Sequence, residues 1–204
     1  MPGKVLALIF SLFMIAPLWA GTVLILGDSL SAGYGLADQK NWVALLDQKL
    51  RQYPGNWQTV NLSTSGDTTS NGLAKLPAAL QKYKPEIVVI ELGANDGLRG
   101  LSLLQMSKNL ETMINMSRQS NARVVLLATK LPPNYGQQFL TRFDKAYKDL
   151  AQKYKLVFVA MFLEGVAGHR EYMQNDNIHP NMAAQSKILD NVWPVIEPLI
   201  KNTN

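Results

Sequence analysis

Residues 22–31, with the sequence TVLILGDSLS, decide how the fold of this chain is interpreted. Residues 23–26 are four consecutive apolar side chains, and a glycine and the polar residues Asp28 and Ser29 follow them directly. A short, continuous apolar run that ends in glycine indicates a strand buried on both faces. Such strands belong to parallel sheets, whose ligands bind at the carboxyl ends of the strands. Asp28 and Ser29 are therefore expected to lie at a functional edge of the sheet.

The same pattern recurs along the rest of the chain. Apolar strands are predicted at residues 22–26, 57–62, 86–92, 123–129 and 156–160, and helical spacing at 42–50, 71–83, 103–118, 137–153 and 181–200. Strands that alternate with helices predict an α/β fold, a three-layer α/β/α sandwich around a parallel sheet. Pro77 is expected to interrupt the second of these helices.

The composition excludes several classes of protein. A chain of 204 residues with 47% hydrophobic and 17% charged residues fits one folded domain and is too apolar to be disordered. The absence of cysteine excludes disulfides, thiolate metal sites and a cysteine nucleophile. The net charge of +5 is not gathered into runs, so no nucleic-acid partner is expected.

The first twenty residues differ from the rest. Lys4 is their only charged side chain, residues 5–16 are apolar except for Ser11, and Pro17 precedes a small residue at position 20. This order is typical of a secretory signal peptide, which predicts export to the periplasm or the medium. We therefore expect a signal peptide at 1–20, a single folded domain at 21–204 and no stable membrane insertion after cleavage. A retained membrane anchor is the alternative.

Four polar clusters follow predicted strands or precede the last helix. They are residues 27–31 (GDSLS), 63–67 (STSGD), 93–97 (GANDG) and 176–180 (DNIHP). Because the carboxyl ends of parallel strands meet at one edge of the sheet, these clusters are expected to converge there. Asp28 and Asp67 are expected to hydrogen-bond within the loops, and no metal site is expected.

A serine nucleophile needs a base, and the chain has only two histidines, His169 and His179. Asp176 precedes His179 by three residues, so one turn of chain can bring its carboxylate to the imidazole. Ser29, His179 and Asp176 could therefore form a catalytic triad. Two simpler roles stay open: Ser29 as a turn or capping residue, and Asp176 as a turn or helix-capping residue before a helix that begins at Pro180.

Motifs of other enzyme classes are absent from the sequence. It has no G-x-S-x-G nucleophile elbow, no G-x-x-x-x-G-K-[ST] phosphate loop and no G-x-G-x-x-G dinucleotide motif at residues 27–29. Acyl transfer also requires donors for an oxyanion. The backbone N–H groups of Ser29 and Gly66 and the side-chain amide of Asn95 are candidates, although both Gly66 and Asn95 could equally be turn residues.

Taken together, the four clusters resemble those of the GDSL, or SGNH, hydrolase family. Its four marker residues match Ser29, Gly66, Asn95 and His179, and its aspartate matches Asp176. The resemblance covers nearly the whole chain after residue 20. It implies a flavodoxin-like fold with a five-stranded parallel sheet in the order 2-1-3-4-5.

The resemblance also implies an activity. It implies hydrolysis of carboxylic esters and thioesters, as by an acyl-CoA thioesterase, lysophospholipase or arylesterase of broad acyl specificity, without a cofactor. Ser29 would attack, His179 would act as base, Asp176 would orient His179, and Ser29, Gly66 and Asn95 would form the oxyanion hole.

A substrate loop is implied as well. Leu131 and Pro132 would belong to a mobile loop beside the acyl-binding groove, although a plain strand-to-helix connection is the alternative. The expected partner is a small-molecule acyl ester or thioester, and the chain is expected to act as a monomer. The alternatives are an arylesterase restricted to simple short-chain esters and a non-catalytic ligand-binding module.

Overall fold

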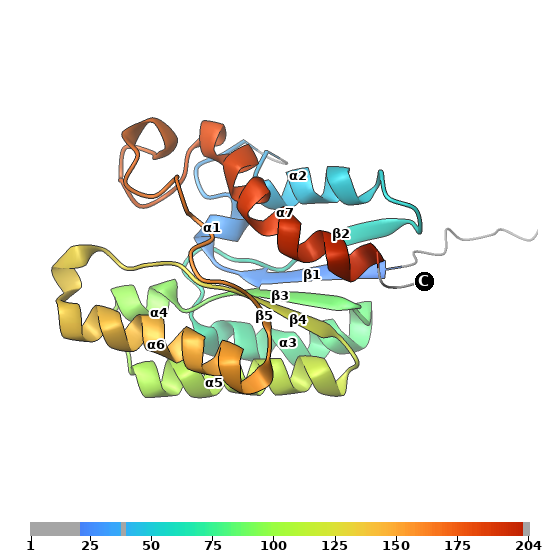
Figure 1. The fold of residues 1–204 in the computed structure, drawn as a ribbon, viewed down its shortest axis with the longest axis horizontal. Helices are drawn as coiled ribbons and strands as arrows, with labels where there is room; N and C mark the ends of the chain where they lie inside the picture. Colours follow the sequence, from blue (N-terminus) through green and yellow to red (C-terminus); the bar gives the residue numbers. More distant parts are fainter. Residues whose placement is uncertain (1–20, 38–39, 202–204) are drawn as a thin grey trace, which may run out of the picture.

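The computed structural model describes residues 21–37 and 40–201, and it contains one parallel sheet. The strand order is β2-β1-β3-β4-β5, as the family resemblance implies (Figure 1). The strands are β1 (Gly21–Gly27), β2 (Trp57–Asn61), β3 (Ile87–Glu91), β4 (Arg123–Leu127) and β5 (Val157–Val159).

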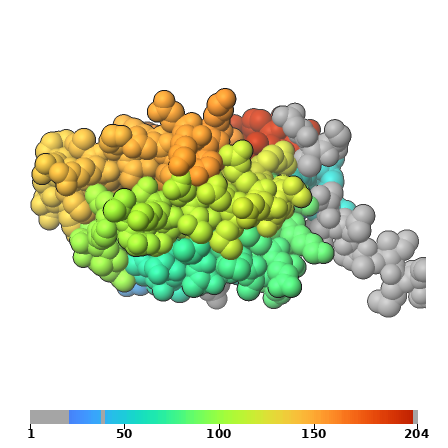
Figure 2. Space-filling model, turned by 90° about the horizontal axis from the view of Figure 1, so that it is seen from below, coloured from blue at the N-terminus to red at the C-terminus, as the bar shows by residue number. Residues whose placement is uncertain are grey.

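Helices cover both faces of the sheet, which confirms the predicted three layers. Two helices, α2 (Trp42–Leu50) and α7 (Gln185–Lys201), lie on one face (Figure 1). The opposite face is covered by α3 (Thr69–Tyr83), α5 (Leu103–Gln119) and α6 (Gln137–Tyr154). Figure 2 looks onto this second face, where the three helices form adjacent bands.

The side chains of β1 explain why its sequence is continuously apolar. Val23 and Ile25 belong to the core beneath α2 and α7, whereas Leu24 and Leu26 belong to the core beneath α3, α5 and α6. All four are fully buried. Because successive residues of a strand point to opposite faces, a strand covered on both sides has no polar position.

Two helix predictions need correction. The helix expected at 181–200 begins only at Gln185, after a 3₁₀ turn at Met182–Ala184, so Pro180 does not open it. Helix α3 runs through Pro77 without interruption. Pro77 is exposed, so the carbonyl that its missing N–H leaves free can face solvent, while the neighbouring Leu76 and Leu80 are buried and hold the helix by packing.

Short elements at the carboxyl edge of the sheet were not anticipated from the sequence. They are α1 (Ser29–Ala32), α4 (Ala94–Leu98) and the 3₁₀ turns η1 (Pro133–Tyr135), η2 (Arg170–Tyr172) and η3 (Met182–Ala184). None spans enough residues to show helical periodicity. The predicted signal peptide at 1–20 lies outside the described residues, and none of the described helices is long and apolar enough to cross a membrane.

Leu24 offers a direct test of the buried central strand. The change Leu24→Ala should lower the free energy of unfolding by about 2–5 kcal/mol, because the residue is 0% exposed and leaves a cavity. The control Leu104→Ala, at a position 68% exposed, should change it by less than about 0.5 kcal/mol. Urea unfolding measures both, and equal losses would contradict this assignment of the core.

Candidate active site

Strand β1 delivers Ser29 to the start of helix α1. Asp28 caps this helix, and its Oδ1 accepts a hydrogen bond of 3.0 Å from the backbone N–H of Leu30. Ser29 is the first helical residue and is half-buried. The N–H of Gly33 returns to the carbonyl of Ser29 and closes the single turn. The Ser29 side chain is thus held at the carboxyl end of the central strand.

His179 and Asp176 reach Ser29 from the loop that precedes α7. The Nε2 atom of His179 lies 2.9 Å from the Oγ of Ser29, and its Nδ1 lies 2.6 Å from Oδ2 of Asp176. A proton on Nδ1, bonded to the carboxylate, leaves Nε2 free to accept from the serine hydroxyl. The three side chains therefore form one continuous hydrogen-bonded chain.

Asp176 accepts hydrogen bonds from a turn of its own backbone and also contacts His179. Its Oδ1 accepts hydrogen bonds of 3.0 Å from the backbone N–H groups of Ile178 and His179, as in a turn, while Oδ2 contacts the imidazole. Burial opposes ionisation of this carboxyl group, but the hydrogen bonds from His179 and Ile178 outweigh it and lower the pKa of Asp176 from 3.8 to about 2. Asp176 is therefore a carboxylate at neutral pH.

His169, the other histidine, takes no part in this arrangement. Its side chain is exposed, and its described contacts are with Glu171 at 3.7 Å and with the ring of Tyr172. The choice of His179 over His169 that the sequence favoured therefore agrees with the geometry.

Gly66 and Asn95 come from the loops that follow β2 and β3. Among the residues that the structure describes, no carbonyl or side chain accepts a hydrogen bond from the backbone N–H of Ser29 or of Gly66. The Nδ2 of Asn95 donates to Oδ2 of Asp28 at 3.1 Å and to the carbonyl of Asp67 at 3.0 Å. The backbone N–H groups of Ser29 and Gly66 are thus available to a ligand, whereas both hydrogens of the Asn95 amide are already used in hydrogen bonds.

Helix α4, which carries Asn95, depends on a glycine. Gly93 has a φ of +118°, and a Cβ atom there would lie 2.1 Å from the hydroxyl oxygen of Tyr147. Only glycine adopts this conformation in so little space. The chain can therefore turn sharply from β3 into α4 and bring Asn95 beside the start of α1.

Two buried acids tie α1 to its neighbours. Oε2 of Glu91, at the end of β3, accepts from the hydroxyl of Ser31 at 2.7 Å and from the backbone N–H of Asp28 at 3.3 Å. Burial, and then the charge of Asp28, raise the pKa of Glu91 well above its usual value. Burial also raises the pKa of Asp28 to about 6, although the hydrogen bond from Leu30 opposes this.

The segment that begins with Leu131 and Pro132, expected to bind substrate, contacts α4. Leu131 is buried, and a Cβ atom on Gly97 would lie 2.5 Å from its Cδ1, whereas Pro132 is exposed. The hydroxyl of Tyr135 donates to the carbonyl of Leu98 at 2.8 Å. This segment thus lies beside the helix that holds Asn95.

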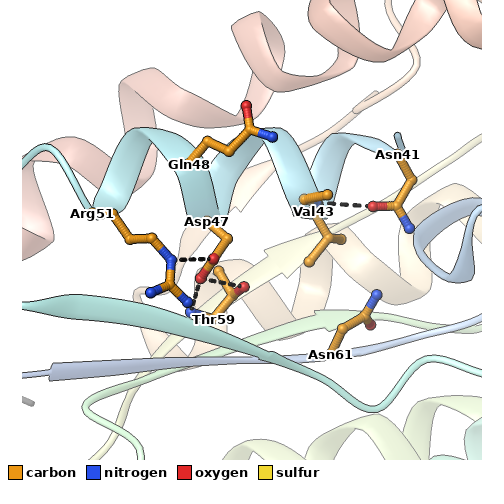
Figure 3. Close-up of a pocket in the computed structure, with 8 residues that line it drawn as sticks. Asn41, Val43, Asp47, Gln48, Arg51, Thr59 and Asn61 are labelled. Atoms are coloured by element: carbon orange, nitrogen blue, oxygen red, sulfur yellow. Dashed lines mark hydrogen bonds and ion pairs between the residues drawn. The ribbon is translucent and has the colours of Figure 1, made fainter. Parts of the chain in front are cut away.

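A polar pocket of about 580 Å³ lies between α2 and the edge strand β2, apart from Ser29 and His179 (Figure 3). Asp47 bridges its walls, with hydrogen bonds from Arg51 at 2.6 Å and from the backbone of Thr59 at 2.7 Å. Asn41 and Asn61, at its rim, both donate to the carbonyl of Ser31. These two asparagines therefore hold the end of α1, and the pocket lining does not include Ser29, Asp176 or His179.

Sequence reasoning missed two residues at the site, Tyr34 and Gln174. The Tyr34 ring lies 4.4 Å from the His179 ring, centroid to centroid. Gln174 donates through Nε2 to the carbonyls of Tyr34 and Pro180, and through its backbone to His179. Tyr34 lies between two glycines five residues after Ser29, and this position so close to the serine could have marked it as a site residue. No sequence pattern marks Gln174.

The raised pKa of Asp28 predicts a pH-dependent stability difference. Because folded Asp28 binds its proton more tightly than the unfolded chain does, its contribution to stability is present below pH 3.8 and is lost as the pH rises through about 6. The wild type should therefore lose up to about 3 kcal/mol more unfolding free energy than Asp28→Asn between pH 4 and 7. Urea unfolding at both pH values measures this, and parallel pH dependences would contradict it.

Comparison with known sequences supports the family resemblance. The profile of the GDSL-like Lipase/Acylhydrolase family matches residues 25–187. The chain is 48% identical to "Esterase TesA" of Pseudomonas aeruginosa, over 89% of this chain and 90% of that protein. It is 42% identical to "Arylesterase" of Vibrio mimicus, over 82% and 84% of the two chains. It is 40% identical to "Thioesterase 1/protease 1/lysophospholipase L1" of Escherichia coli K12, over 90% and 86%.

Solved structures agree with these sequence matches. A crystal structure of a TesA protein superposes with a TM-score of 0.84 at 48% identity, and the match covers 87% of this chain and 99% of that one. Fold, sequence and family profile therefore point to the same assignment. The chain belongs to the GDSL-like lipase/acylhydrolase family and is a hydrolase, as its four polar clusters predicted.

Proposed function

We propose that this protein hydrolyses carboxylic esters and thioesters through a covalent acyl-Ser29 intermediate. The observation that carries the proposal is the hydrogen-bonded chain from Ser29 Oγ through His179 to Asp176, at 2.9 and 2.6 Å. A serine hydroxyl is a weak nucleophile until a neighbouring base takes its proton, and this geometry supplies the base and a carboxylate that stabilises the resulting imidazolium.

In the first half-reaction the Ser29 oxygen bonds to the substrate carbonyl carbon while its proton moves to Nε2 of His179. The tetrahedral intermediate then breaks its bond to the alcohol oxygen or thiol sulfur, and His179 gives that atom the proton. In the second half-reaction a water molecule attacks the acyl carbon, His179 takes its proton, and the proton returns to Ser29 as the acid leaves.

The negative oxygen of the intermediate would be bound by the Ser29 and Gly66 N–H groups and by Asn95. To donate to it, Asn95 must release or share a hydrogen that now bonds to Asp28 or to the Asp67 carbonyl. A charged oxyanion is a stronger acceptor than a neutral carbonyl, so exchange with Asp67 is the favourable route.

The acyl group would extend toward Leu131 and Pro132, because their segment packs beside the helix that carries Asn95. The names of the relatives, which include esterase, arylesterase, thioesterase and lysophospholipase, support a broad range of acyl substrates. We further propose a monomer without a cofactor that a signal peptide at residues 1–20 directs to the periplasm or the medium.

Ser29→Ala tests the mechanism. The variant should lose both labelling by a fluorophosphonate probe and turnover of p-nitrophenyl esters, because the alanine has no oxygen to acylate. The control Ser120→Ala, at an exposed residue that ends α5, should label and turn over normally. Persistent hydrolysis by purified, folded Ser29→Ala would overturn the mechanism.

Asn95→Ala tests the oxyanion role. Loss of one preorganised donor should lower kcat by roughly 10²–10³-fold with little change in KM, since the interaction strengthens as the oxyanion forms. Asn115→Ala is the matched control, because the Asn115 side chain donates to the Tyr154 hydroxyl at 3.2 Å, between α5 and α6 and away from Ser29. Steady-state kinetics on one p-nitrophenyl ester compares them, and an effect confined to KM would contradict the role.

A further inference from the structure

Tyr34 contacts His179, the base of the proposed reaction, although it belongs neither to the proposed triad nor to the proposed oxyanion hole. Its ring centroid is 4.4 Å from that of His179, with an angle of 38° between the planes. Even so, Tyr34 is 52% exposed. One part of the ring therefore covers the imidazole, and the remainder faces open space beside it.

The backbone of Tyr34 is anchored to both halves of the site. Its N–H donates to the carbonyl of Ser29 at 3.1 Å, and its carbonyl accepts from Nε2 of Gln174 at 2.7 Å. The same Nε2 donates to Pro180 at 3.0 Å, and the backbone N–H of Gln174 donates to the His179 carbonyl at 2.8 Å. The Tyr34 ring is thus placed by α1, which carries Ser29, and by residues 173–182 before α7, called here the histidine segment.

The chemistry of the reaction puts the leaving group on this side of the site. His179 must give its proton to the departing oxygen or sulfur, so that atom must come within hydrogen-bond reach of Nε2. The oxyanion donors Gly66 and Asn95 come from the other loops, after β2 and β3. A group attached directly to the departing atom would therefore lie beside the imidazole, where the exposed part of the Tyr34 ring is available to it.

We infer that Tyr34 forms a leaving-group subsite and makes the enzyme selective for esters of aromatic alcohols. A phenyl ring on the departing oxygen can pack against the exposed tyrosine ring, a contact that a small alkyl group cannot make. Two more exposed apolar side chains, Ile178 and Met182, are close to His179 in the sequence. The inference rests on the proposed serine mechanism and identifies its preferred leaving group.

The test compares phenyl butyrate with ethyl butyrate, which form the same butyryl-enzyme and differ only in the leaving group. Tyr34→Ala should lower kcat/KM for the phenyl ester by roughly three- to tenfold, the value of an aromatic contact, and that for the ethyl ester by less than about twofold. The rate of deacylation should not change, because the leaving group has gone by then. Tyr34→Phe, which keeps the ring, should restore the preference for the phenyl ester over the ethyl ester that Tyr34→Ala loses.

The outcomes separate this inference from the mechanism beneath it. Equal losses on both esters, together with slower deacylation, would mean that Tyr34 only positions His179, and the subsite would be rejected while the acyl-serine mechanism stood. An unchanged ratio between the two esters would also reject it. Activity that survives Ser29→Ala would instead reject the mechanism. If Tyr34→Ala does not fold, Tyr34→Leu still covers His179 without a ring and should show the same loss of aryl selectivity.

Discussion

The burial of β1 on both faces is the constraint on which the rest of this structure depends. Because helices cover both sides of the strand, residues 23–26 are all apolar and fully buried, and the polar residues Asp28 and Ser29 follow where the strand ends. In the order β2-β1-β3-β4-β5, the chain leaves β1 and β3 toward opposite edges of the sheet. Ligands of such sheets bind where the chain leaves two neighbouring strands in opposite directions, and here α1 with Ser29 follows β1 and α4 with Asn95 follows β3.

Hydrogen bonds between the two sides keep the nucleophile and the amide donor in register. Glu91 from β3 binds the backbone of Asp28 and the hydroxyl of Ser31 at the start of α1, and Asp28 in turn binds the Asn95 amide on α4. Burial of these acids is costly, as their raised pKa values show. These hydrogen bonds let Glu91, at the end of β3, orient the start of α1, and let Asp28, after β1, orient the Asn95 amide.

The histidine segment is an irregular loop made rigid by local bonds. Asn181 donates through its side chain to the carbonyls of Glu171 and Met173, and Gln174 joins the same segment to Tyr34. Reactive residues on loops require such support, since a loop has no ladder of backbone hydrogen bonds to place them. The same bonds that place His179 against Ser29 also place the Tyr34 ring against His179, so the base and the proposed leaving-group subsite share one scaffold.

Much of this protein could be predicted from its sequence. The apolar runs predicted all five strands, the residues after them supplied every marker of the family, and the spacing of Asp176 from His179 favoured that histidine over His169. These signals are local, because periodicity, strand burial and a one-turn separation are properties of short segments.

The sequence did not predict four features: the short helices α1 and α4, the start of α7 at Gln185, and the passage of α3 through Pro77. Packing and capping between distant segments decide them. For the same reason only the tertiary structure brings Glu91 to Asp28, and Tyr34 to Gln174 and His179, since these pairs lie 63 to 145 positions apart in the sequence and meet through folding alone.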